Sequence, residues 1–197
     1  MAEPEEITFR SHPLEEYVQM IERFHGHLAP GVLLGGFMVE LAYQQLPTEG
    51  LFDAISETPT CLPDAIQLLT PCSAGNGWLQ VVDSGRFALT IFEKTTGAGV
   101  RVHLDADRLT PGSQLSNWFL KLVPKAEQDK AQLIEEIVQA GSRILSFRKV
   151  HVDLAGRRQK KGVKTQICPV CRESYPRDHG PRCRHCSGER MYYRDAS

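Results

Sequence analysis

Residues 168–186 read CPVCRESYPRDHGPRCRHC, and this stretch determines how the C-terminal part of the chain folds. It contains two Cys-x-x-Cys pairs separated by eleven residues. Two residues between cysteines allow a tight turn to point both sulfur atoms at one ion, and two such turns complete a tetrahedral site. A segment this short and polar cannot bury an apolar core large enough to hold it together. The pattern therefore predicts one structural zinc ion bound by Cys168, Cys171, Cys183 and Cys186, in a zinc ribbon or a treble clef-like module.

Two other interpretations of the cysteines remain open. His179 and His185 lie in or beside the same stretch and are alternative ligands, and the cysteines could instead form redox pairs or belong to a separate core. The N-terminus, MAEPEEITFR, is acidic where a secretory signal needs a basic start and an apolar segment. We therefore expect a cytoplasmic protein, and a reducing compartment favours metal over disulfides.

The rest of the chain is long enough for one ordinary domain. Residues 153–166, DLAGRRQKKGVKTQ, have almost no apolar content and a block of charge, which is typical of a basic linker. We predict a core domain over residues 1–152, a linker over 153–166 and a zinc-binding domain over 167–197. The longest apolar stretch, residues 32–46, includes Glu40 and two glutamines and is too short to span a membrane.

The core domain is predicted to be α+β. Apolar residues at three- and four-residue spacing predict a helix from about Pro13 to His25, and a second, almost wholly apolar helix begins after Pro30. Glycines in the second helix permit close approach of another backbone. Strands are predicted at 79–82, 87–92 and 100–104, with a hairpin turn at 83–85, and further helices at 111–122 and 126–144. We expect an antiparallel sheet with packed helices.

Two bends of small residues carry side chains suited to chemistry. Residues 24–31 read FHGHLAPG and place two histidines one residue apart between two helices, and residues 70–77 read TPCSAGNG and carry a thiol. Two imidazoles on a bend can converge on one ion or substrate. The alternative is that the histidines are hydrogen-bonded in a helix-joining turn and that Cys72 is a small buried residue.

The two bends together resemble the FmdE family, named after the E subunit of formylmethanofuran dehydrogenase, whose members carry an F-H-G-H-x-C-P-G signature. A second family stretch, approximately D-A-I-Q-x-L-T-G-C-T-x-G-x-G-x-L, is similar to residues 64–79. The resemblance extends over residues 12–150, and some members add a zinc-binding tail. The residues in step with the family are Phe24, His25, Gly26, His27, Pro30, Gly31, Ala65, Ile66, Gln67, Thr70, Cys72, Gly75, Gly77, Asp83, Gly85 and the segment 97–102.

Three positions depart from the family pattern: Ala29 replaces the signature cysteine, Pro71 replaces a glycine, and Arg86 replaces a lysine. The family name comes from a component associated with a tungsten or molybdenum enzyme that reduces carbon dioxide on a methanofuran carrier. The chain has no domain of the size needed for a molybdopterin and no set of cysteines for iron–sulfur clusters. The resemblance therefore implies an accessory protein, associated with an oxidoreductase, rather than the catalytic component.

The predicted core site combines the two bends. We expect a second transition-metal or ligand site formed by His25, His27 and Cys72, with neighbours that orient the ligand at Gln67, Asp83 and Arg101. Imidazole and thiolate suit zinc, iron, nickel or copper better than magnesium, and three ligands leave a coordination position open.

Three functions follow from these features. The first is a metal-binding accessory protein with a core site and a zinc tail for protein contacts. The second is a metal-dependent enzyme acting on a small molecule, and the third is a metal-sensing regulator whose tail binds nucleic acid. From residue 156 to 194 there are eleven Lys and Arg against three Asp and Glu, although the whole chain has a net charge of −1. We expect weak, salt-dependent nucleic-acid binding at most, and the apolar helix together with the resemblance predicts a homodimer.

Overall fold

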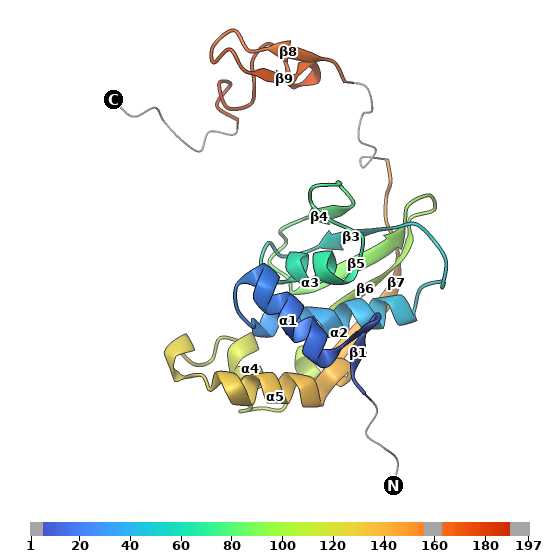
Figure 1. Cartoon of the computed structure of the whole chain (residues 1–197), viewed down its shortest axis with the longest axis vertical. Coiled ribbons are helices and arrows are strands. Elements are labelled where there is room, and N and C mark those ends of the chain that lie inside the picture. The colour runs from blue at the N-terminus through green and yellow to red at the C-terminus, as the bar shows by residue number, and fades with distance from the viewer. Residues whose placement is uncertain (1–5, 156–162, 190–197) are drawn as a thin grey trace. The chain divides into compact units, whose positions relative to one another are not determined.

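The computed structural model describes residues 6–155 and 163–189, and the chain divides into two compact units, residues 1–153 and 154–197 (Figure 1). Each unit is described by itself. Residues 156–162 of the predicted linker lie outside the described residues, as do residues 190–197 at the end of the basic tail.

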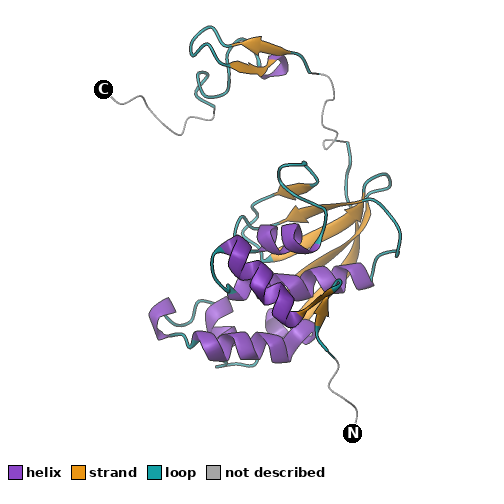
Figure 2. Cartoon of the chain, in the orientation of Figure 1, coloured by secondary structure: helices purple, strands orange, loops and turns teal. Residues whose placement is uncertain are grey.

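The first unit combines a mixed sheet with five α-helices, which confirms the α+β class (Figure 2). The sheet has the strand order β4-β3-β5-β6-β7, and only the β3–β4 pair is parallel. A separate two-stranded ribbon, β1–β2, precedes the first helix. The elements are β1 (Thr8–Phe9), β2 (His12–Pro13), α1 (Leu14–His25), α2 (Pro30–Gln44), β3 (Phe52–Ser56), α3 (Leu62–Leu69), β4 (Leu79–Val81), β5 (Ala88–Glu93), β6 (Ala98–Leu104), η1 (Ala106–Arg108), α4 (Gln114–Phe119), η2 (Lys125–Glu127), α5 (Lys130–Ala140), η3 (Gly141–Ile144) and β7 (Leu145–His151).

The hairpin predicted at residues 83–85 is wrong. β4 and β5 are not neighbours, because the unpredicted strand β3 lies between them and pairs Ala54 with both Leu79 and Ile91. β3, α3 and β4 form a crossover unit, and a helical crossover is what allows two consecutive strands to run parallel. The sequence FDAIS of β3 is too short and too mixed to give a period-two signal.

The helices predicted near the C-terminal end of the body are shorter in the structure. α5 ends at Ala140 because Gly141 takes a positive φ of 56°, and a single 3₁₀ turn then leads into β7. Residues 145–151 therefore form an unpredicted edge strand, and the predicted helix over 126–144 is confirmed only in its centre.

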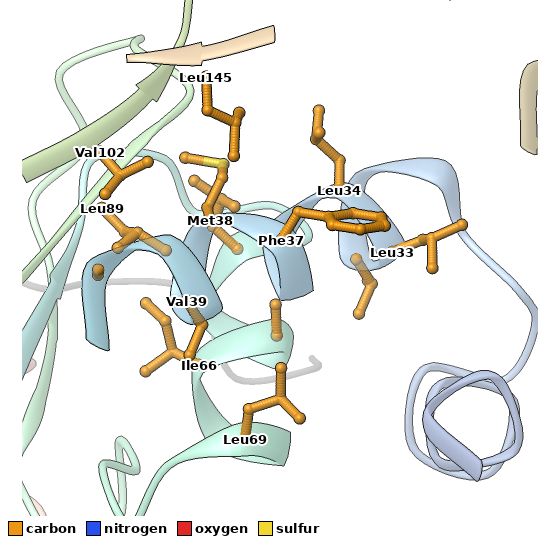
Figure 3. Close-up of a cluster of buried hydrophobic side chains, with 14 of the residues drawn as sticks. Leu33, Leu34, Phe37, Met38, Val39, Ile66, Leu69, Leu89, Val102 and Leu145 are labelled. Atoms are coloured by element: carbon orange, nitrogen blue, oxygen red, sulfur yellow. The ribbon is translucent and has the colours of Figure 1, made fainter. Parts of the chain in front are cut away.

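α2 is the central helix of the body, as its composition predicts. It packs against α1, α3, α5 and the strands β5 to β7, and ten of its fifteen residues are buried. Figure 3 shows its apolar side chains meeting those of α3 on one side and of the sheet on the other. This core fixes the N-terminal end of α2, where the histidine-bearing bend enters the helix.

A close approach at Gly36 gives a test of this packing. A Cβ atom at Gly36 would lie 2.4 Å from a ring carbon of Tyr17. Tyr17 is fully buried and its hydroxyl donates to the Val32 carbonyl at 2.8 Å, so the ring cannot move aside cheaply. We expect Gly36→Ala to lower the free energy of unfolding by about 2 kcal/mol, because overpacking outweighs the gain in helix propensity. Urea denaturation measures the shift, and Gly75→Ala, in an open turn, should change it by less than about 0.5 kcal/mol. Equal effects of the two substitutions would contradict the packing.

Candidate functional site

The four tail cysteines converge as predicted. The described tail contains the antiparallel strands β8 (Thr165–Ile167) and β9 (Ser174–Pro176), followed by η4 (Arg177–His179). The four sulfur atoms lie within 4.8 Å of one another, and those of Cys171 and Cys183 are 3.8 Å apart. A tetrahedral site with Zn–S bonds of about 2.3 Å also requires sulfurs about 3.8 Å apart. The donor set therefore fits zinc, and His179 and His185 are not part of the cluster.

The protonation of the tail cysteines also favours a bound cation. Backbone N–H groups, that of Cys183 foremost, donate to the Cys168 sulfur and lower the pKa of this thiol to about 6. Hydrogen bonding with Cys183 and the neighbouring thiols raises the pKa of Cys186 to about 12. The set cannot ionise fully by itself, because each thiolate opposes the next, whereas a divalent cation removes that opposition.

In the body, the two histidines of the bend line a cavity of about 660 Å³. His25 is the last residue of α1, and Gly26 follows it in the left-handed conformation with φ of 89° and ends the helix. Pro30 opens α2 at its first turn, so the bend is held between two helix ends. Cys61 and Asp64, at the N-terminal end of α3, line the same cavity.

His25 and Asp64 form a close pair. The Nδ1 atom of His25 lies 2.6 Å from Oδ2 of Asp64, and the His25 and Asp64 side chains are only 22% and 28% exposed. A carboxylate accepts here, so the proton is assigned to Nδ1, which leaves the lone pair on Nε2. The rings of His25 and His27 are 5.0 Å apart between centroids. An imidazole oriented by a carboxylate is the usual arrangement of a metal-binding histidine.

Cys72 does not join the histidines. It is fully buried, and its thiol donates to the Phe52 carbonyl at 3.4 Å. Among the described residues, only the four tail cysteines bring three or more candidate ligand atoms within 4.8 Å of one another. The reason is that Cys72 follows the C-terminal end of α3, whereas the histidines lie near its N-terminal end. Eight helical residues separate the two ends by about 12 Å.

The cavity contains a different thiol, Cys61, which the sequence reasoning missed. The sequence Cys61-Leu-Pro-Asp64, with proline and an acidic residue in the first turn, is a helix-start signal that could have placed α3. Cys61 itself has a positive φ of 60°. A Cβ at Gly31 would lie 2.8 Å from the Cys61 sulfur, so the glycine of the bend leaves room for this side chain.

The three residues predicted to orient a ligand have structural contacts instead, and none is among the residues that line the cavity. Gln67 accepts from the Ala74 N–H at 3.2 Å, and Asp83 accepts from the Gly85 N–H at 3.1 Å. Arg101 is buried on β6 and donates to Glu57 through Nε at 2.5 Å and Nη2 at 2.8 Å.

The Glu57–Arg101 pair makes stability depend on pH. The hydrogen bond from Arg101 holds the pKa of Glu57 below its ordinary value, and the charges of Arg101 and Arg86 add to this against the desolvation by burial. Because the folded pKa is lowered, the stabilisation is complete above the unfolded pKa of about 4.3 and is lost as the pH falls through the folded value.

We therefore expect Glu57→Gln to lower the free energy of unfolding at pH 7 by about 3 kcal/mol, since it leaves a buried guanidinium without its carboxylate. The difference between variant and parent should shrink below about pH 4. Urea denaturation from pH 3 to 7 measures it, and Glu15→Gln, on the exposed face of α1, is the matched control. A difference that does not change with pH would contradict this role of the carboxylate.

Comparison with known proteins identifies the family. Residues 24–152 match the family model described as "FmdE, Molybdenum formylmethanofuran dehydrogenase operon". The chain belongs to the FmdE family. Residues 158–193 match the model of the FmdE treble clef zinc finger, which decides between the two modules predicted for the tail. This FmdE protein thus has a metal-binding tail of a known type.

Two relatives extend the comparison. One is an FmdE-like protein of the tungsten formylmethanofuran dehydrogenase type from Syntrophus aciditrophicus, whose crystal structure is 48% identical in sequence and has a TM-score of 0.87. It covers 96% of this chain and 100% of its own. The other, a probable S-adenosyl-L-methionine-binding protein of Archaeoglobus fulgidus, is 31% identical over 139 residues, which are 64% of this chain and 38% of the relative. Most of that second relative therefore has no counterpart here, and its name does not assign a ligand to the cavity.

Across residues 6–155 and 163–189, no helix combines the length and the apolar character that a membrane-spanning helix needs.

Proposed function

We propose that this FmdE-family protein is a metal-binding accessory protein whose body binds a transition-metal ion at His25 and His27. The treble clef tail, with its structural zinc, serves contacts with another protein. The observation that carries the proposal is the imidazole pair on the cavity wall, with His25 oriented by Asp64 at 2.6 Å. The accessory role is supported by the operon-based family description and by the FmdE-like relative of known structure.

The imidazole pair suits zinc, nickel, iron or copper, because these ions prefer nitrogen ligands where magnesium prefers oxygen. Two protein ligands leave coordination positions to water or to a bound molecule. Cys61 supplies the thiol on this cavity wall, and burial raises the pKa of that thiol, with the charge of Asp64 adding to the effect. An uncharged thiol leaves the imidazoles as the first ligands at neutral pH.

The test is the metal stoichiometry of the full chain. With zinc already bound in the tail, the parent should take up one further equivalent of Ni²⁺ in a calorimetric titration. A variant with His25→Ala and His27→Ala should keep the tail zinc and lose the second equivalent. His12→Ala, which removes a histidine outside the cavity, should behave as the parent. A parent that takes up no second equivalent, or a double variant that retains it, would overturn the proposal.

A metal-dependent enzyme is the second candidate, and the size of the cavity favours it. A volume of about 660 Å³ is far more than an ion with its waters occupies. A metal with open positions beside such a space could activate water or polarise a small substrate.

Two further expectations stay predictions. The homodimer awaits a measurement of mass in solution. The weak nucleic-acid binding rests on the basic tail, part of which lies outside the described residues.

A further inference from the structure

The cavity has a second wall that plays no part in the metal proposal. It is formed by Trp118 of α4, Lys125 of η2, Lys130 and Leu133 of α5, and Gln128 between them. Figure 1 shows α4 and α5 side by side, and these two helices pack against each other. A cavity of about 660 Å³ lies within the range of sites for small organic molecules.

The charges on this wall favour an anion. Asp64 is the one carboxylate among the described residues that line the cavity, and it is bound to His25. Within the described part of the chain, no ion pair engages Lys125 or Lys130. Two ammonium groups therefore face the cavity against one carboxylate that already has a partner.

Nearby acidic side chains do not cancel this charge within the cavity. Asp129 accepts from the Gln132 N–H at 3.0 Å and so caps α5, and Glu136 accepts from the Leu115 N–H at 2.8 Å. Glu127 lies in the same turn as Lys125 but does not line the cavity.

Trp118 gives the wall an apolar, planar surface. Its ring packs with those of Phe87 and Phe119, at centroid distances of 6.4 and 6.1 Å, which holds the indole in place. A fixed indole beside two cations matches a molecule with an anionic group at one end and an apolar or aromatic body at the other.

We infer that the cavity binds a small organic anion, a carboxylate or a phosphate monoester, whose charge pairs with Lys125 and Lys130 and whose body packs on Trp118. This inference deepens the proposed function and rests on it for the role of the cavity, but the anion site itself needs no metal in the body.

The experiment uses the fluorescence of Trp118 in the full chain. The chain has two tryptophans, so Trp78→Phe leaves Trp118 as the only one. This variant, with zinc in the tail and no other metal, is titrated with benzoate, phenyl phosphate, inorganic phosphate and the neutral isostere benzamide. Benzoate or phenyl phosphate should change the Trp118 emission and bind about tenfold more tightly than benzamide. Their relative affinities tell a carboxylate site from a phosphate site.

Two sets of variants complete the test. Lys125→Gln with Lys130→Gln should weaken the preferred anion about tenfold, whereas Lys149→Gln, on exposed β7, should leave the affinity unchanged. The inference is overturned by equal binding of benzamide, by binding of inorganic phosphate as tight as that of phenyl phosphate and benzoate, by no response to either aromatic anion, or by lysine variants that bind as the parent does. The same titrations with His25→Ala and His27→Ala separate the two proposals. Anion selectivity without a second metal equivalent sinks the metal site alone, and a second metal equivalent without anion selectivity sinks this inference alone.

Discussion

Replacing Cys183 with serine is expected to release the tail zinc and to unfold the tail while the body stays folded. Apart from Cys168, Tyr175 is the one apolar side chain that is buried in the described tail, so the tail has almost no core of its own. Structural zinc contributes about 10–16 kcal/mol to modules of this kind, far more than one buried tyrosine. Hydrogen exchange should show loss of protection in β8 and β9 and unchanged protection in α2.

The matched control for the tail is His179→Ala. His179 lies close to the cysteines in sequence but outside their cluster, so this variant should keep one zinc per chain and the protected strands. Retention of zinc by Cys183→Ser, or loss of protection in α2 along with the tail, would count against a separately folded zinc module.

The second large effect is expected from Asp64→Asn, which should weaken the metal of the body by about 10- to 100-fold. Asparagine keeps the size of the side chain but removes the charge that holds the Nδ1 proton of His25 and raises the basicity of Nε2. Competition with a chelator of known Ni²⁺ affinity measures the change. Asp53→Asn removes a carboxylate that pairs with Lys94 outside the cavity, and it should leave the affinity unchanged. An Asp64→Asn variant with the parent's affinity would show that the carboxylate does not serve the metal.

Local patterns in the sequence predicted what depends on local spacing. The Cys-x-x-Cys pairs needed only two tight turns, and the helices α1 and α2 needed only their periodicity and the prolines that open them. The order of the sheet strands depends instead on which strands meet across the chain. That information is absent from a five-residue segment such as β3, whose insertion between β4 and β5 displaced the predicted hairpin.

The candidate core site was half predicted for the same reason. His25 and His27 belong to one bend, so their proximity follows from the sequence. The choice between Cys61 and Cys72 depends on which end of α3 faces the bend, and α3 itself was not predicted. The shared small-residue character of residues 70–77 favoured the wrong end. Gly31, which leaves room for the Cys61 sulfur, had been interpreted only as a point of backbone approach.

The most direct test of the metal site in the body is anomalous diffraction from crystals of the full chain, with zinc in the tail, soaked in Ni²⁺ and measured at the nickel absorption edge. We expect a peak in the body cavity about 2.1 Å from the Nε2 atom of His25 and within bonding distance of a His27 ring nitrogen. The peak should be absent in crystals of the His25→Ala, His27→Ala variant. A nickel signal confined to the four tail cysteines, with none in the cavity of the parent, would contradict the account.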